Sequence, residues 1–370
     1  MRDPGFPGIR GGQFKANITR LLDNGYLRAS LKFIDDRNQF ILPLPFQNPD
    51  DPDYVPGFSS FGAMSTNEGN HIRVRIPPGE LELPLDDGLR TNAYWLTADA
   101  NFDFSGGWSV QNTAQIMQND QGWNAIIPFD VVQSGDFVTS FLQDYYGNYY
   151  RGVLQAQGTL PRDDQITQNI APNQKFTIQA ANVSHRLFFT NHFGDSGKLP
   201  FNTANNLLAP GGEWHVEKPI SAFQNQVQLL KTVGKHKFSA GLYFANYTQT
   251  NRWFFTDILT DVRDNPRFID LIVDQAMLQY SFISPTTGQP TTVAAPISNL
   301  AATQNGFRRF LSLYRSGSGS TTVFSGVVGG ELKLTDRLRA DLGFRYENND
   351  FVQTAENQSN FDLDGNPFTY

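Results

Sequence analysis

The stretch ELKLTDRLRADLGFRYEN, residues Glu331–Asn348, alternates in its second half between apolar and polar side chains. One parity holds the apolar residues Leu338, Ala340, Leu342, Phe344 and Tyr346. The other parity holds Arg339, Asp341, Gly343, Arg345 and Glu347. Successive side chains of a β-strand point to opposite faces, so this stretch predicts a strand with one apolar and one charged face. The fold class depends on whether the apolar face meets a protein core or lipid.

Four pairs of such alternating segments, each joined by a tight-turn signal, predict four β-hairpins. The pairs are Phe14–Leu22 with Tyr26–Phe33, Tyr94–Phe104 with Trp108–Met117, Phe223–Lys231 with Lys237–Thr248, and Thr321–Leu334 with Leu338–Phe351. Asp23-Asn24-Gly25, which joins the first pair, is a strong signal for a tight turn. We expect about eight strands of roughly 8–14 residues each.

The segments between the hairpins are of a different kind. Residues 36–90, 118–212 and 252–318 are long, rich in Asn, Gln, Pro, Gly, Asp and Ser, and hold few alternating runs. Structureless connections longer than about 12–15 residues are uncommon in compact soluble domains. Tight turns that alternate with very long loops are typical of outer-membrane barrels, with short periplasmic turns and long extracellular loops. Because no fixed-period repeat or linker interrupts residues 1–370, we predict one domain.

Composition narrows the class of protein. The chain of 370 residues has a net charge of −7 and no basic stripe with interleaved aromatic residues, which argues against a nucleic-acid partner. It has no cysteine, so it forms neither disulfides nor thiolate metal sites. No run approaches the roughly 18 apolar residues of a membrane-spanning helix. A membrane β-barrel remains compatible, because only every second residue of its strands faces lipid.

Three features favour lipid over a protein core. The expected strands are longer than the roughly 5–6 residues typical of soluble sheets, and the long loops alternate with the tight turns. The polar parity carries charges that suit a water-filled lumen, such as Asp99 and Asp103. Aromatic residues gather near strand ends, as in the girdles of outer-membrane barrels; they are Tyr26, Tyr94, Trp95, Phe104, Trp108, Tyr346 and Phe351. We therefore predict an all-β fold, an antiparallel transmembrane β-barrel in the bacterial cell outer membrane.

Three segments resemble barrel strands of TonB-dependent outer-membrane receptors. They are GGQFKANITRLLDNGYLRASLKFIDDRNQFILPLPF (Gly11–Phe46), EWHVEKPISAFQNQVQLLKTVGKHKFSAGLYFANY (Glu213–Tyr247) and LKLTDRLRADLGFRYENNDF (Leu332–Phe351). The resemblance implies that residues 1–370 are part of a 22-stranded barrel, without the family's N-terminal plug domain, TonB box and closing strand. With periplasmic turns, both ends of this chain would be extracellular, which also leads us to expect a part of a larger barrel. The implied function is uptake of a siderophore, vitamin or oligosaccharide, energised by the TonB complex through the plug.

The best candidates for ligand contact are aromatic. Tyr145, Tyr146, Tyr149 and Tyr150 lie in DYYGNYYRG (Asp144–Gly152), on an expected Gly-Asn turn, where their rings suit stacking on a sugar or an aromatic siderophore. Trp123 is a further candidate. The competing interpretation is that these rings pack the loop against its neighbours.

No catalytic or metal chemistry is predicted. The histidines are scattered, with no two at ligand spacing on an expected element; they are His71, His185, His192, His215 and His236. There is no nucleophile elbow, phosphate loop or zinc-binding helix motif, so we predict neither an enzyme nor a cofactor. Two other functions stay open: a passive outer-membrane channel or structural barrel without a plug, and a soluble all-β binding or adhesin domain.

Overall fold

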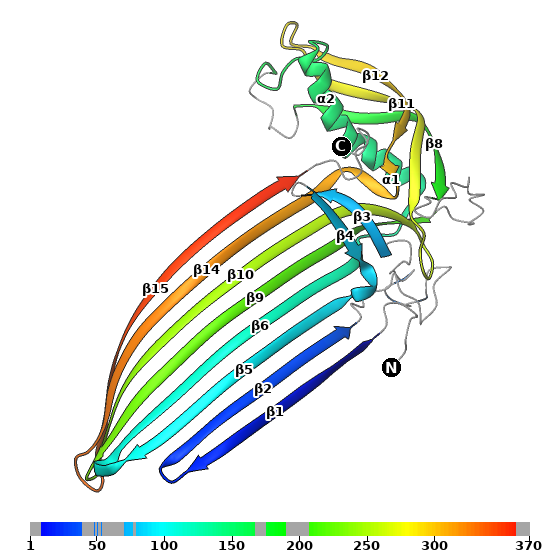
Figure 1. Cartoon of the computed structure of the whole chain (residues 1–370). Coiled ribbons are helices and arrows are strands. Elements are labelled where there is room, and N and C mark those ends of the chain that lie inside the picture. Colours follow the sequence, from blue (N-terminus) through cyan, green and yellow to red (C-terminus); the bar gives the residue numbers. More distant parts are fainter. Residues whose placement is uncertain are drawn as a thin grey trace.

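The computed structural model describes residues 9–38, 48, 50, 53, 70–76, 79–166, 175–189 and 207–359. Its main feature is a curved antiparallel sheet of long strands in the order β1-β2-β5-β6-β9-β10-β14-β15 (Figure 1). The strands are β1 (Arg10–Leu22), β2 (Gly25–Asn38), β5 (Leu89–Phe104), β6 (Trp108–Pro128), β9 (Leu207–Val233), β10 (His236–Asp261), β14 (Phe307–Lys333) and β15 (Arg339–Ser359). Two short strands, β7 (Val132–Gln133) and β13 (Thr303–Gln304), pair with β9 and β14. The all-β prediction is thus confirmed.

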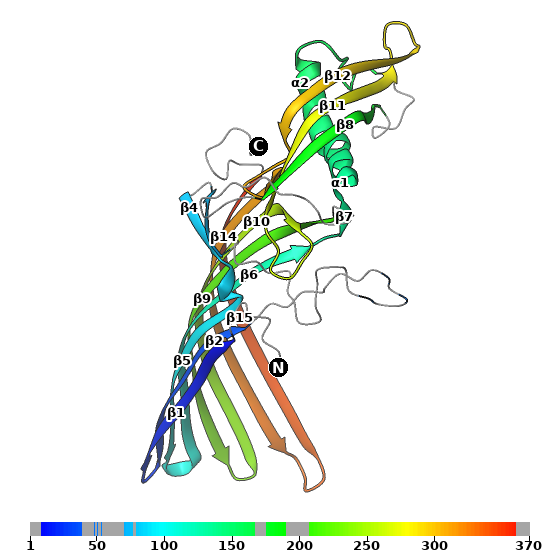
Figure 2. The same cartoon turned by 90° about the vertical axis from the view of Figure 1, so that its right-hand side faces the viewer.

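The four predicted hairpins are confirmed, and their turns lie together at one end of the sheet (Figure 2). In the second turn, Gly106 and Gly107 have φ angles of +73° and +80°. A Cβ at Gly107 would meet the carbonyl oxygen of Thr232, in the neighbouring hairpin, at 2.6 Å. The third and fourth turns are joined by an ion pair of 2.8 Å between Lys235 and Asp336. Gly107 is therefore required by both its positive φ angle and the close neighbouring turn, and Gly106 by its φ angle alone.

The strand register places the apolar parities of all the long strands on one face. Leu96, for example, pairs with Leu31 of β2 and with Ile116 of β6. The large apolar residues of this face, from β1 to β15, are Phe14, Ile18, Leu27, Leu31, Phe33, Tyr94, Leu96, Phe104, Trp108, Ile116, Phe223, Val227, Leu229, Phe238, Leu242, Phe244, Phe324, Val328, Leu342, Phe344 and Tyr346. They are exposed, with Leu242 at 57% and Phe344 at 67%. In the described part of the chain, no second layer covers this apolar band.

The opposite parity is polar and more buried. Ala245 and Ser325, which alternate with the apolar band on β10 and β14, are only 0% and 3% exposed. Figures 1 and 2 show that the sheet curves like part of a cylinder wall. Side chains crowd together on the concave side of such a wall, so the exposures place the polar parity inside and the apolar band outside. We call these two surfaces the inner and the outer face.

Several strands are longer than the sequence predicted. β9, β10 and β14 have 27, 26 and 27 residues, so they extend well into the segments that were expected to be loops. The prediction failed there because the pattern inverts. Glu213, His215 and Glu217 share the parity of the outer face but are polar, whereas Trp214 and Val216 lie on the inner parity. Because the apolar residues switch from the outer to the inner parity along the strand, the alternation does not predict one continuous strand.

The second and third long segments also form an ordered module beyond the strand ends. It contains α1 (Ser134–Ser140), the π-helix η4 (Phe141–Tyr146), α2 (Gly147–Ala156) and a sheet of β8 (Thr177–Phe189), β11 (Ile269–Ile283) and β12 (Pro290–Ala301) (Figure 2). Its core includes Phe141, Leu271 and Tyr280, each 0% exposed. The expectation of little regular structure is therefore wrong for these residues. None of the helices within the described ranges is long and apolar enough to cross a membrane.

A buried hydrogen bond between β11 and α2 links the sheet and the helices of this module, and its loss has a testable consequence. The buried hydroxyl of Tyr280 on β11 donates to the carbonyl of Gly147 at the start of α2, at 2.9 Å. We expect Tyr280→Phe to destabilise the module by about 1 kcal/mol, since a buried hydrogen bond is lost without loss of ring packing. Hydrogen exchange of the β11 amides should become roughly fivefold faster. Unchanged exchange would mean that this bond does not hold the two halves together.

The first long segment contributes a hairpin that lies over the outer face above the apolar band (Figure 1). It consists of β3 (Asn70–Ile76) and β4 (Gly79–Pro84), followed by the 3-10 turn η2 (Leu85–Asp87). Val74 and Leu83 on its lower side pack against Phe254 of β10. In the upper half of the sheet, the hairpin covers the outer face. The outer-parity side chains there need not form an apolar row, because they meet protein.

Candidate functional site

The inner face carries a chain of hydrogen bonds at the level of the apolar band. Gln115 donates to the hydroxyl of Thr97 at 3.0 Å, and Gln224 donates to Gln115 at 2.9 Å. The hydroxyl of Tyr243 then donates to Gln224 at 3.1 Å. These residues come from β5, β6, β9 and β10, so the polar wall is ordered across four strands. Such a surface is suited to water and polar solutes.

Above this wall, the inner face is hollowed by a cavity of about 460 Å³, which we call the inner-wall pocket. Its lining comes from β9, β10, β14 and β15 and comprises Ile220, Tyr247, Thr248, Gln249, Asn251, Gly317, Ser318, Gly319, Thr321, Phe351 and Gln353. Two of these are glycines on the inner parity of β14, where the absence of side chains deepens the hollow. The remaining surface offers two aromatic rings and three primary amides. This combination of rings and a few polar groups is common in ligand sites.

An aromatic belt borders the pocket on the side of the loop module. It consists of Trp123, Trp214, Trp253 and Phe255, with the cations Lys218 and Arg315. Trp123 and Trp214 stack with centroids 6.2 Å apart and planes within 8°. The Lys218 ammonium lies 4.5 Å from the ring centre of Trp123, and the Arg315 guanidinium lies 4.8 Å from that of Trp253. The indole nitrogen of Trp253 is buried and has no hydrogen-bond partner within the described chain.

The structure places the predicted ligand residues in two different settings. Trp123 lies in the aromatic belt on β6. The four tyrosines lie in η4 and α2, so the expected Gly-Asn turn is wrong: Gly147 and Asn148 are helical. Tyr146 stacks at 5.7 Å on Tyr150, and both pack against the module core together with Tyr145. Tyr149 is 49% exposed. The packing interpretation thus describes three of the tyrosines, and ligand contact by any of the four stays a prediction.

Beside the belt, a buried ion pair of the sheet contacts the module through Arg308. Arg308 of β14 lies 3.2 Å from Asp257 of β10, and both side chains are below 10% exposed. The same guanidinium lies 4.0 Å from the ring centre of Tyr145. Burial raises the pKa of Asp257 to about 6, although Arg308 opposes this shift. The opposite charges of Arg308 and Asp257 compensate each other, and the contact of Arg308 with Tyr145 holds η4 at the rim of the sheet.

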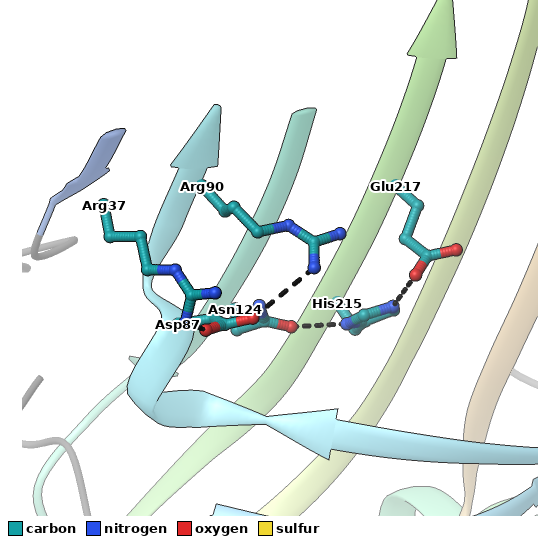
Figure 3. Close-up of polar contacts among 6 residues, drawn as sticks. All are labelled: Arg37, Asp87, Arg90, Asn124, His215 and Glu217. Atoms are coloured by element: carbon teal, nitrogen blue, oxygen red, sulfur yellow. Dashed lines mark hydrogen bonds and ion pairs between the residues drawn. The ribbon is translucent and has the colours of Figure 1, made fainter. Parts of the chain in front are cut away.

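A second polar cluster lies on the outer face beneath the β3–β4 hairpin (Figure 3). Asp87 of η2 pairs with Arg37 of β2 and, at 3.6 Å, with Arg90 of β5. Figure 3 shows these two arginines reaching the turn from neighbouring strands. The contacts fix the end of the hairpin to the sheet, so we call this group the hairpin clamp.

The same cluster continues onto β6 and β9. His215 is hydrogen-bonded to Asn124 and lies 3.6 Å from Glu217, which also pairs with Arg252 at 3.2 Å (Figure 3). The interactions with His215 and Arg252 lower the pKa of Glu217 to about 2. A cavity of about 360 Å³ lies beside these residues under the hairpin. The sequence interpretation missed this cluster, although the polar side chains at 213, 215 and 217 on an otherwise apolar parity were a usable signal.

The hairpin clamp leads to a prediction about the hairpin. We expect Asp87→Asn to weaken the attachment of η2 by about 1–2 kcal/mol, since charge-assisted hydrogen bonds contribute this much at partly buried sites. Limited proteolysis after β4 should become several-fold faster. Glu80→Gln, on the exposed side of β4, is the matched control and should leave proteolysis unchanged. Equal cleavage of both variants would contradict the role of Asp87.

Comparison with known proteins adds no assignment: no protein-family model matches the chain, and no curated protein matches it.

Proposed function

We propose that this chain forms part of the barrel wall of a bacterial outer-membrane transporter of the TonB-dependent receptor class. Such a transporter binds a large solute and lets it pass without changing it chemically. The observation that carries this proposal is the apolar band. It runs across eight strands, is exposed throughout, and is backed by a polar inner face. A soluble sheet would bury such a face against another layer.

The dimensions of the band support the proposal. On β5 the outer parity is apolar at every position from Tyr94 to Phe104. At about 3.4 Å per residue and a strand tilt of about 40°, ten residue steps span roughly 26 Å across a membrane. The apolar belt of outer-membrane barrels is about 25 Å tall. The band also ends where the β3–β4 hairpin begins to cover the outer face.

A groove in the band suits hydrocarbon chains. It has a volume of about 470 Å³, and its lining is almost entirely apolar: Val227, Leu229, Ala240, Gly241, Leu242, Gly326, Val327, Val328, Phe344 and Tyr346. Small residues on β10 and β14 form its floor, and larger ones form its walls.

The sheet edges favour a larger closed wall. β1 and β15 each pair on one side only within the described residues. In hydrocarbon, each unsatisfied backbone group costs several kcal/mol, so membrane sheets close into barrels. In a membrane, the free edges of β1 and β15 therefore need partners, and we assign these partners to further strands of the same barrel. The 22 strands, the plug and the coupling to TonB come from the family resemblance alone.

Single cysteines provide the test, because the chain has none of its own. Spin labels at Val227→Cys and Gln226→Cys, in the full-length protein in lipid vesicles, report the environment of adjacent outer and inner positions. We expect the label at 227 to collide mainly with oxygen and the label at 226 mainly with a water-soluble nickel chelate. Equal access, or the reverse order, would overturn the proposal.

The alternative of a passive channel makes a different electrical prediction. Full-length protein in a planar bilayer should conduct little if a plug fills the lumen. Large, steady conductance would favour the plug-free channel.

A further inference from the structure

The inner-wall pocket and the aromatic belt form one continuous surface. Asn251 and Trp253 are successive inner-face residues of β10, and Gly317 and Arg315 are successive inner-face residues of β14. From Gln249 to Phe255 the surface extends six residue steps along β10, or roughly 20 Å at 3.4 Å per step. This length exceeds a single ring-sized ligand and suits a short chain of linked rings.

We propose that this surface binds an acidic oligosaccharide, that is, linked sugar rings bearing carboxylates. The inference rests on the proposed function, because it takes the inner face as the path of the solute. It names the chemical class of that solute.

The aromatic residues suit sugar rings. The pocket presents Tyr247 and Phe351, and the belt presents Trp123, Trp214 and Trp253. The flat faces of such side chains provide large apolar contact area, and each ring keeps a fixed orientation at low entropic cost. Several rings spaced along one wall match several linked sugars better than one compact ligand.

The amides favour sugar hydroxyls over other flat solutes. Gln249, Asn251 and Gln353 line the pocket. Each primary amide both donates and accepts hydrogen bonds, as does each hydroxyl of a sugar. A ferric catecholate complex presents acceptors and ring faces but no hydroxyl donors, so it would use only half of this hydrogen-bonding capacity.

The charge distribution favours an acidic ligand. Lys218 and Arg315 are cationic. The inner-face residues within 117–123 of β6, 214–222 of β9, 247–255 of β10, 313–321 of β14 and 351–357 of β15 include no Asp or Glu. The next inner-face residue of β10, Asp257, is paired with Arg308. The acidic residues of these strand segments, Glu217 among them, lie on the outer parity. This part of the inner face therefore carries a positive charge, whereas the whole chain has a net charge of −7.

The experiment measures binding to the full-length protein in detergent by titration calorimetry. The probes are a trimer of galacturonic acid, a neutral maltotriose and a ferric catecholate complex. We expect the acidic trimer to bind most tightly. Arg315→Gln should weaken it at least tenfold and leave maltotriose binding within about twofold. Gln353→Ala should weaken both sugars. Trp108→Ala, an outer-face change, is the matched control and should alter neither.

Several results would overturn the inference. They are no binding of either sugar, neutral sugar bound as tightly as the acidic trimer, or equal affinity of wild type and Arg315→Gln. Preferred binding of the ferric catecholate would also overturn it. Spin-label access at 226 and 227 is measured separately. If it is as expected while sugars fail to bind, the inference alone fails; if access is reversed, the proposed function itself fails.

Discussion

Val227→Arg is expected to destabilise the membrane-inserted protein by about 2–4 kcal/mol, whereas Gln226→Arg is expected to have little effect. Val227 lies in the middle of the apolar band on β9, paired with Leu242 and Asn112. An arginine near the bilayer midplane loses its hydration, and the cost on the lipid face of barrels is of this size. Gln226 lies on the inner face, where a cation meets water and polar neighbours. Reversible urea unfolding of the full-length protein in lipid vesicles measures both variants.

The two positions are adjacent in one strand, so they share depth, backbone geometry and distance from the turns. Only the face differs. Equal losses at 226 and 227 would show that both faces have the same environment, and the outer placement of the apolar band would be wrong. A larger loss at 226 would mean that the apolar band faces inward.

Folding stability is expected to fall as pH rises from about 4.5 to 8, and Glu213→Gln should remove the part of this loss that falls between about pH 6 and 8, above the pKa of Asp257. Glu213 lies on the outer parity of β9, about ten residues beyond Phe223 and outside the proposed membrane-spanning band. It is 1% exposed, and neither carboxyl oxygen has a hydrogen-bond partner in the described part of the chain. Its register neighbours are Ile126 and Thr256, both buried. Burial raises the pKa of Glu213 from 4.5 to about 8.

The sign of the effect follows from proton linkage. The folded protein holds this proton more tightly than the unfolded chain, so its full stability is present below pH 4.5. Stability is then lost as pH rises through the pKa of the folded state, and it levels off above about 8. A shift of this size corresponds to a loss on the order of 3–5 kcal/mol. Glutamine cannot ionise, so the variant should match wild type at pH 4 and be clearly more stable at pH 9.

Thermal unfolding of the full-length protein in detergent, at pH 4 to 9, provides the measurement. Glu217→Gln is the matched control, because Glu217 lies four residues away on the same face but is exposed in part and paired with Arg252. That variant should retain the loss of stability between pH 4.5 and 8. A wild-type stability that stays flat across this range would mean that Glu213 is not buried as a lone acid.

The lower half of the sheet could be predicted because two local signals agree there. Alternation assigns each strand, and turn residues such as Asn24-Gly25 and Gly106-Gly107 assign each hairpin. Both signals depend only on residues near each other in the chain.

The upper half could not be predicted in the same way, since its contacts join distant segments. Trp214, Trp253 and Arg315 come from three strands, and only the register brings them together. The tyrosine segment was read as a turn because Gly147-Asn148 is a common turn pair. The helical spacing of its aromatic and apolar residues was available, however: Phe141 and Tyr145 are four residues apart, as are Leu142, Tyr146 and Tyr150 in succession. Burial of that stripe against β8 and β11 decided the helix.

The strand order has a consequence for assembly of the wall. Each long strand pairs with its predecessor and its successor in the order in which the chain supplies them, and the module and the β3–β4 hairpin lie outside these pairings. The sheet can therefore grow by successive addition of two-stranded units, with each new unit templated on the free edge of the last. No strand has to be inserted between two that are already paired. The module and the β3–β4 hairpin can fold afterwards without breaking any hydrogen bond between the long strands.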